Sequence, residues 1–191
     1  MVAHSAAVRW DLRIPGGLDG AVRRSLSGEG VSLAVVTADA PDQHCVLSAN
    51  QPGHIATWDL ARGPVVTTRG AFVAAWGEGI DIDVNVARRA GAAFFGGAGL
   101  FLQQISGRQG VVLIHGSGDF DERELAPGEQ LVVSTGNLAA FAKEVDYDIV
   151  GVRGARRVLF GREGLFMTRL TGPGWVLLQT LKRRRGSGES G

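Results

Sequence analysis

Apolar and polar residues alternate in short runs along most of this chain, which is the pattern of β-strands. The clearest run covers residues 79–86, where four apolar residues stand at every second position and so share one face of a half-buried strand. Residues 31–38 and 65–76 are rich in valine, threonine and aromatic residues and are bounded by turn-forming residues. All three segments are predicted strands.

Further short strands follow, each closed by glycine or by a glycine-proline pair. They are predicted at residues 94–95, 100–105, 111–114, 130–134, 160, 165–170 and 175–181. Turn signals recur about every 8 to 12 residues, a rhythm typical of β-sandwiches and barrels. Helix is scarce, with one turn predicted at residues 137–143 and two turns at residues 18–26.

One phrase of the sequence occurs twice. Residues 95–102 read FGGAGLFL, and residues 160–167 read FGREGLFM. The similarity continues through residues 105–107 and 170–172, and then through the apolar runs at 111–114 and 175–178. We therefore predict a duplicated strand-turn unit, with its two copies at residues 95–114 and 160–178, inside a single β-rich domain that spans residues 1–181.

Composition supports a β protein without cross-links. The 29 glycines argue against an all-helical fold, because each interior glycine costs a helix about 1 kcal/mol relative to alanine. Cys45 is the single cysteine, which excludes an intramolecular disulfide and favours a reducing, cytoplasmic location. The first 13 residues do not resemble a secretory signal, and the longest uncharged window, residues 90–107, has too many glycines for a membrane span.

The charge is concentrated at the end of the chain. The net charge is +1, but without the four basic residues at 182–185 and Glu189 the chain has 16 basic and 18 acidic residues. Residues 182–191 contain no apolar side chain, so we predict a disordered basic and Gly/Ser-rich tail. The tail could contact nucleic acid or an anionic membrane surface. A solubilising end is the favoured interpretation, because no aromatic residue that would stack on bases is interleaved with the arginines.

Motifs of catalysis are absent from the sequence. The phosphate-binding loop, the dinucleotide fingerprint and the Gly-x-Ser-x-Gly elbow all fail at required positions. His44, Cys45 and His54 lack the paired spacing of zinc ligands, and His4 and His115 have no partner at ligand spacing, so all are interpreted as structural or surface residues. No catalytic, cofactor-binding or metal-binding residue is assigned.

The densest acidic patch consists of Asp119, Asp121, Glu122 and Glu124. Such carboxylates could bind calcium or share acid and base roles. The patch lacks the spacing of a calcium loop, and Phe120 and Leu125 resemble buried neighbours of exposed acids on a strand or turn. A solvated face is therefore favoured over an enzymatic site.

Several phrases, in order, resemble one known family. They are the repeated phrase at 95–101, residues 125–133 (LAPGEQLVV), 137–141 (NLAAF), 145–149 (VDYDI), 161–166 (GREGLF) and 170–174 (LTGPG). Together they are similar to the mitochondrial-biogenesis family named for altered inheritance of mitochondria protein 24. The resemblance covers residues 53–181; the chain departs from it at Ala98, where glutamate is common, and at Arg162, where glycine is common.

The resemblance implies an all-β fold like that of the tryptophan RNA-binding attenuator protein. Duplicated β-sandwich or short double-stranded β-helix units would assemble into a ring-like homo-oligomer, with a trimer favoured. It implies no catalytic residue and no cofactor.

We therefore expect a non-enzymatic, oligomeric scaffold or interaction module, with peripheral membrane association as a further option. The alternative is a ligand- or RNA-binding protein that uses Arg88, Arg89, Arg153, Arg156 and Arg157. The negative charge of residues 1–181 disfavours nucleic acid, whose binding depends on phosphate contacts.

Overall fold

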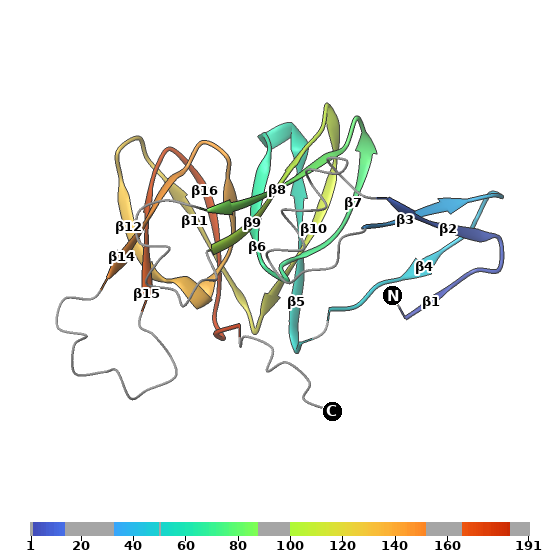
Figure 1. Cartoon of the computed structure of the whole chain (residues 1–191), viewed down its shortest axis with the longest axis horizontal. Coiled ribbons are helices and arrows are strands. Elements are labelled where there is room, and N and C mark those ends of the chain that lie inside the picture. Colours follow the sequence, from blue (N-terminus) through green and yellow to red (C-terminus); the bar gives the residue numbers. More distant parts are fainter. Residues whose placement is uncertain (1, 14–32, 50, 88–99, 152–165, 184–191) are drawn as a thin grey trace.

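The protein is built almost entirely from β-strands. The computed structural model describes residues 2–13, 33–49, 51–87, 100–151 and 166–183. In this part of the chain the helical elements are two single turns, η1 (Leu60–Arg62) and η3 (Thr135–Asn137). Figure 1 shows three groups of strands side by side along the long axis. The all-β class predicted from the sequence is confirmed.

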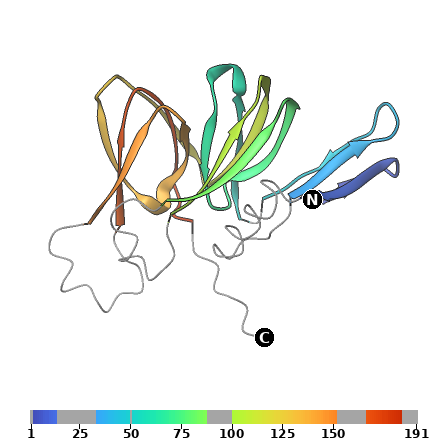
Figure 2. The same ribbon diagram turned by 45° about the horizontal axis from the view of Figure 1, so that its top comes forward.

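The N-terminal group consists of two separate two-stranded sheets. β1 (Ala3–His4) pairs with β4 (Cys45–Val46), and β2 (Val8–Arg13) pairs with β3 (Leu33–Ala38). None of these strands joins a sheet of the remaining described chain, and Figure 2 shows them projecting from one side of it. An isolated two-stranded sheet is at best marginally stable in water.

Twelve further strands form the body of the molecule, six in each of two sets. The first set is β5 (Gly53–Asp59), β6 (Val65–Thr68), β7 (Phe72–Glu78), β8 (Asp81–Ala87), β9 (Leu100–Ser106) and β10 (Gln109–Ser117). The second set is β11 (Phe120–Leu125), β12 (Gln130–Ser134), β13 (Leu138–Ala142), β14 (Asp146–Gly151), β15 (Phe166–Thr171) and β16 (Gly174–Gln179).

The two sets pair their strands in the same order. In the first set β10 lies between β5 and β7, and β9 lies between β6 and β8. In the second set β16 lies between β11 and β13, and β15 lies between β12 and β14. Each strand of the second set thus has the pairing position of the strand numbered six lower in the first set, so that β16, for example, corresponds to β10.

Strand β13 joins the two sets. It pairs with β16 on one side and with β6 on the other, which makes one continuous sheet in the order β11-β16-β13-β6-β9-β8. Its residue Phe141 stands opposite Val176 of one neighbour and Val66 of the other. The core is shared in the same way, because Trp58 and Ile114 from the first set and Phe141 and Val176 from the second are at most 1% exposed and belong to one cluster.

The helical turn predicted at residues 137–143 is wrong, because residues 138–142 form strand β13 and Asn137 ends the preceding η3 turn. All five residues of β13 are buried. A short apolar run cannot be assigned to helix or strand by periodicity alone, and here ladders on both sides outweigh the helix propensity of the alanines. The other predicted helix, at residues 18–26, lies outside the described residues.

The predicted strand at residues 65–76 is two strands, β6 and β7. The break falls at Gly70, which has a φ of 72° in the left-handed region that glycine tolerates. The amide of Ala71 donates to the carbonyl oxygen of Thr68 at 3.0 Å and closes the turn. The strand predicted from the alternation at residues 79–86 is present as β8.

The predicted start of the disordered tail, at residue 182, lies too early in the chain. Lys182 is exposed, but Arg183 is partly buried and hydrogen-bonded to the body of the protein. The tail is predicted from its lack of apolar residues. That criterion does not detect this contact, because hydrogen bonds between polar atoms hold the segment. Residues 184–191 lie outside the described part, as do residues 95–99 and 160–165 of the repeated phrase.

Candidate functional site

Polar side chains are gathered inside the protein where β10 and β16 end. The described chain buries seven polar side chains: Thr67, Thr68, Gln103, His115, Ser117, Thr168 and Gln179. Three of them, His115, Ser117 and Gln179, lie within the last three residues of β10 or at the end of β16 and are at most 3% exposed. Buried polar groups need hydrogen-bond partners to offset the loss of water.

Gln179 is the centre of this cluster. Its Oε1 accepts a hydrogen bond from the amide of Ser117 at 3.0 Å, and its Nε2 donates to the carbonyl oxygen of Gly136 at 2.7 Å. Its own carbonyl oxygen accepts from Nδ2 of Asn137 at 2.8 Å. The Ser117 hydroxyl donates to Oε1 of Gln51 at 2.8 Å. One side chain therefore ties β10 and β16 to the η3 turn.

The guanidinium of Arg183 completes the cluster. Nη1 donates to the carbonyl oxygen of Gly70, and Nη2 donates to the carbonyl oxygen of His115 at 2.9 Å and to Oε1 of Gln179 at 3.1 Å. Nη2 also lies 3.3 Å from Nδ1 of His115. The main-chain amide of Arg183 donates a hydrogen bond to the carbonyl oxygen of Gly136 at 3.1 Å. We call these acceptors on Gly70, His115 and Gln179 the guanidinium site.

Burial sets the electrostatics of this site. It lowers the pKa of Arg183 from its ordinary value, although a guanidinium stays charged at any physiological pH. Burial is the main cause that lowers the pKa of His115, and the positive charge of Arg183 is the second. A hydrogen bond with the main chain of Gln51 acts in the opposite direction. A neutral imidazole can accept from Arg183 through Nδ1, whereas an imidazolium would place a second positive charge against the guanidinium.

We expect the protein to lose stability as the pH falls below about 6.5, the pKa of histidine in an unfolded chain. Because the folded pKa of His115 is lowered, the unfolded chain binds the proton first, so the free energy of unfolding decreases with falling pH until the folded pKa is reached. Thermal unfolding between pH 7.5 and 5 should show a steeper loss in the wild type than in a His115→Gln variant. His54→Gln, which changes an exposed histidine, is the control; equal slopes in all three proteins would contradict the prediction.

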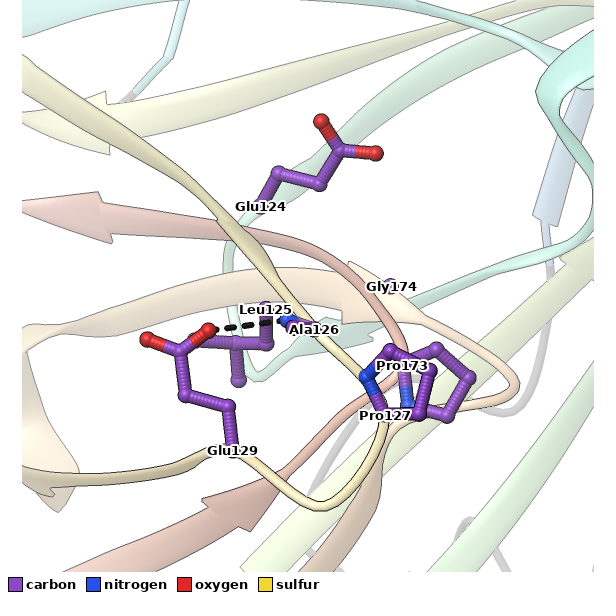
Figure 3. Close-up of a pocket in the computed structure, with 7 residues that line it drawn as sticks. All are labelled: Glu124, Leu125, Ala126, Pro127, Glu129, Pro173 and Gly174. Carbon is purple, nitrogen blue, oxygen red and sulfur yellow. Dashed lines mark hydrogen bonds between the residues drawn. The ribbon is translucent and has the colours of Figure 1, made fainter.

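A second candidate is an open cleft between the β11–β12 turn and the β15–β16 turn (Figure 3). It has a volume of about 460 Å³ and is lined by Glu124, Leu125, Ala126, Pro127, Glu129, Pro173 and Gly174. Oε2 of Glu129 accepts from the amide of Ala126 at 2.8 Å, so this carboxylate already caps its own turn. Figure 3 shows the Glu124 carboxylate pointing away from Glu129. The two acids therefore do not form a pair that could divide acid and base roles.

The acidic patch of the sequence lies along β11 and just before it. Glu122 accepts a hydrogen bond from Arg62 at 3.1 Å, and Asp121 accepts from Arg123 at 2.9 Å. Asp119 lies 3.1 Å from Nδ1 of His54. The four carboxylates thus do not converge on one point: three face basic side chains at the surface and Glu124 borders the cleft.

Arg62 was not anticipated from the sequence. Its guanidinium carbon lies 4.4 Å from the ring centroid of Trp175 and 5.0 Å from that of Trp58, within the range of cation–π attraction. Together with Glu122 these rings hold η1 of the first strand set against β16 of the second. Arg62 is therefore a structural link between the sets.

The structure brings His4, His44 and Cys45 to the short β1–β4 ladder, where His4 stands opposite Cys45, and places His54 on a different strand. Nδ1 of His44 lies 2.9 Å from the hydroxyl of Ser5 and Cys45 is exposed, whereas His54 is the second residue of β5. Within the described ranges no three His, Cys, Asp or Glu side chains are grouped so as to hold a metal ion. The arginines at 88, 89, 153, 156 and 157 lie outside those ranges.

One face of the β5-β10-β7 sheet carries exposed apolar side chains. Ile55 on β5 is 43% exposed and Trp76 on β7 is 54% exposed. On this face Trp76 stands opposite Val111, and Ile55 stands opposite His115, while the exposed Thr57 and Asp59 of β5 lie opposite Leu113 and Val111. Residues at every second position share a sheet face, so its apolar members are Ile55, Trp76 and the partly exposed Val111 and Leu113 of the central strand. We call these four residues the apolar face. An exposed tryptophan among aliphatic residues is typical of a protein–protein contact.

The sequence did not reveal the roles of Gln179 and Arg183 in the guanidinium site. Gln179 gave the only local signal, as a polar residue that ends an apolar strand. Arg183 was assigned to the tail, and nothing in its neighbours reveals that Gly70 lies beside it, 113 residues earlier in the chain.

Comparison with known proteins agrees with the architecture. Protein SPYM3_0169 from Streptococcus pyogenes, known from an X-ray crystal structure, superposes with a TM-score of 0.75 over 95% of this chain and 80% of its own, at 24% identity. That similarity concerns the fold. No curated protein matches the chain significantly. The family model for mitochondrial biogenesis AIM24 matches residues 1–181, including the N-terminal strands, which lie outside the resemblance found at residues 53–181. The chain therefore belongs to the AIM24 family.

Proposed function

We propose that this protein is a non-enzymatic scaffold that assembles from several copies of the chain, with a trimer favoured by the family resemblance. The observation that carries the proposal is the apolar face on β5-β10-β7, where Trp76 exposes 54% of its surface. Burial of apolar surface contributes roughly 25 cal/mol per Å², so contact between copies would be favourable there.

We also propose that the body arose by duplication of a six-strand unit. The identical pairing order of β5–β10 and β11–β16 supports this origin, and so does the repeated phrase. Two similar units in each of three copies would give a ring with approximate sixfold character. In such a ring each apolar face meets a neighbouring unit, which suits a scaffold better than a small-molecule enzyme.

An exposed free thiol at Cys45 suits a reducing compartment such as the cytoplasm. In the described part of the chain no helix is long and apolar enough to cross a membrane. The dispersed carboxylates of β11 favour an interaction module over an acid–base enzyme.

Light scattering coupled to size-exclusion chromatography should give a mass that is a multiple of the 20.1 kDa chain. Trp76→Glu should shift the protein towards the monomer, because a charge buried in an apolar contact is strongly unfavourable. Val132→Glu is the matched control, since Val132 is 49% exposed on β12, outside the apolar face. A wild-type monomer at micromolar concentration would overturn the proposal.

A further inference from the structure

We propose that the acceptors on Gly70, His115 and Gln179 form a binding site for an arginine side chain, which the protein fills with its own Arg183. The C-terminal segment then acts as a bound intramolecular ligand that fastens the end of β16 to the β6–β7 turn and to β10. The proposal is independent of the scaffold function.

The geometry of the acceptors suits a guanidinium. Three oxygen atoms from three different segments accept hydrogen bonds from Nη1 and Nη2, and two of these oxygens share Nη2. A planar fork of fixed donors matches such a divided set of acceptors, whereas an ammonium group is a compact point charge on a flexible stem. The acceptors are neutral, so selectivity rests on direction and spacing rather than on attraction to a carboxylate.

The surrounding residues hold this set in place. Gln179 is fixed through the amide of Ser117 and the carbonyl oxygen of Gly136, so its Oε1 is aimed before the arginine binds. A Cβ at Gly70 would lie 3.0 Å from Nη1 of Arg183, and its φ of 72° favours glycine in addition. The site is thus built by residues that are nearly fully buried and by a glycine that permits close approach.

The ligand is joined to the site by a short tether. Arg183 follows Leu181 and Lys182, both of which are exposed, and its backbone is held by the bond to Gly136. A tethered group binds at a high effective concentration. A protein without this side chain should therefore present an empty site that takes a free arginine derivative with lower apparent affinity.

The test is chemical rescue in the full-length chain. Arg183→Ala should unfold at a lower temperature than the wild type, since the oxygens of Gly70 and His115 lose their charged donor. Addition of N-acetyl-arginine amide at millimolar concentration should raise the melting temperature of this variant along a saturable curve, because a ligand that binds only the folded state stabilises it. N-acetyl-lysine amide at equal ionic strength should not.

Three comparisons decide the outcome. The wild type should show no saturable rise, because its site is occupied, and Arg183→Lys should unfold below the wild type although it keeps the positive charge. Arg123→Ala removes an exposed arginine that pairs with Asp121 and should gain nothing from the arginine derivative. Equal stabilisation by the arginine and lysine derivatives, or of the wild type and Arg183→Ala, would overturn the proposal.

Discussion

Replacement of Phe141 by alanine should lower the free energy of unfolding by about 3–5 kcal/mol. The ring is 1% exposed and packs against Tyr147, with 5.6 Å between ring centroids. It also lies on β13, the strand that joins the two sets between β16 and β6. A loss of this size is a large part of the roughly 5–15 kcal/mol that stabilises a typical domain.

Urea unfolding monitored by tryptophan fluorescence would measure this loss. Phe120→Ala is the control, because Phe120 is only partly buried on the outer strand β11 and should cost less. If Phe141→Ala changed stability by less than about 1 kcal/mol, the idea that β13 is the structural joint of the body would be wrong.

Gln179→Leu should also destabilise the protein, by about 1–3 kcal/mol. Leucine is similar in size, but it leaves the buried amide of Ser117 without its acceptor. It also removes one of the two donors to the carbonyl oxygen of Gly136, which keeps its hydrogen bond from the main-chain amide of Arg183. Each unsatisfied buried group costs about 1–3 kcal/mol, which exceeds the gain from a more apolar side chain. Arg183 loses one acceptor at the same time.

Thermal or urea unfolding would measure the effect, with Gln130→Leu as the matched substitution. Gln130 is exposed on β12, so its replacement should stay within about 0.5 kcal/mol of the wild type. Similar stabilities of the two variants would mean that water satisfies the cluster between β10 and β16, and that Gln179 does not organise it.

The class of fold and the family could be predicted because both depend on local patterns. Alternation at residues 79–86 and glycine-bounded apolar runs predicted strands, and the phrases at 125–133 and 170–174 carried the resemblance. The acids of β11 were likewise interpreted through their neighbour Leu125, which is buried at the end of that strand.

The helix predicted at residues 137–143 shows where local patterns fail. Asn137 followed by an alanine-rich run has a reasonable helix propensity, but propensity is a weak prior. Strand β13 is decided by β6 and β16, which lie far away in the sequence and supply hydrogen bonds on both sides.

The sequence by itself determined that this is a β protein of the AIM24 family with a twice-used phrase, because strand periodicity, turn residues and family motifs are written in neighbouring positions. Only the tertiary structure decided that β13 joins the two strand sets and that Arg183 is a bound group instead of the start of a tail. The physical reason is that ladder partners and hydrogen-bond acceptors up to 113 residues apart meet only when the chain is folded.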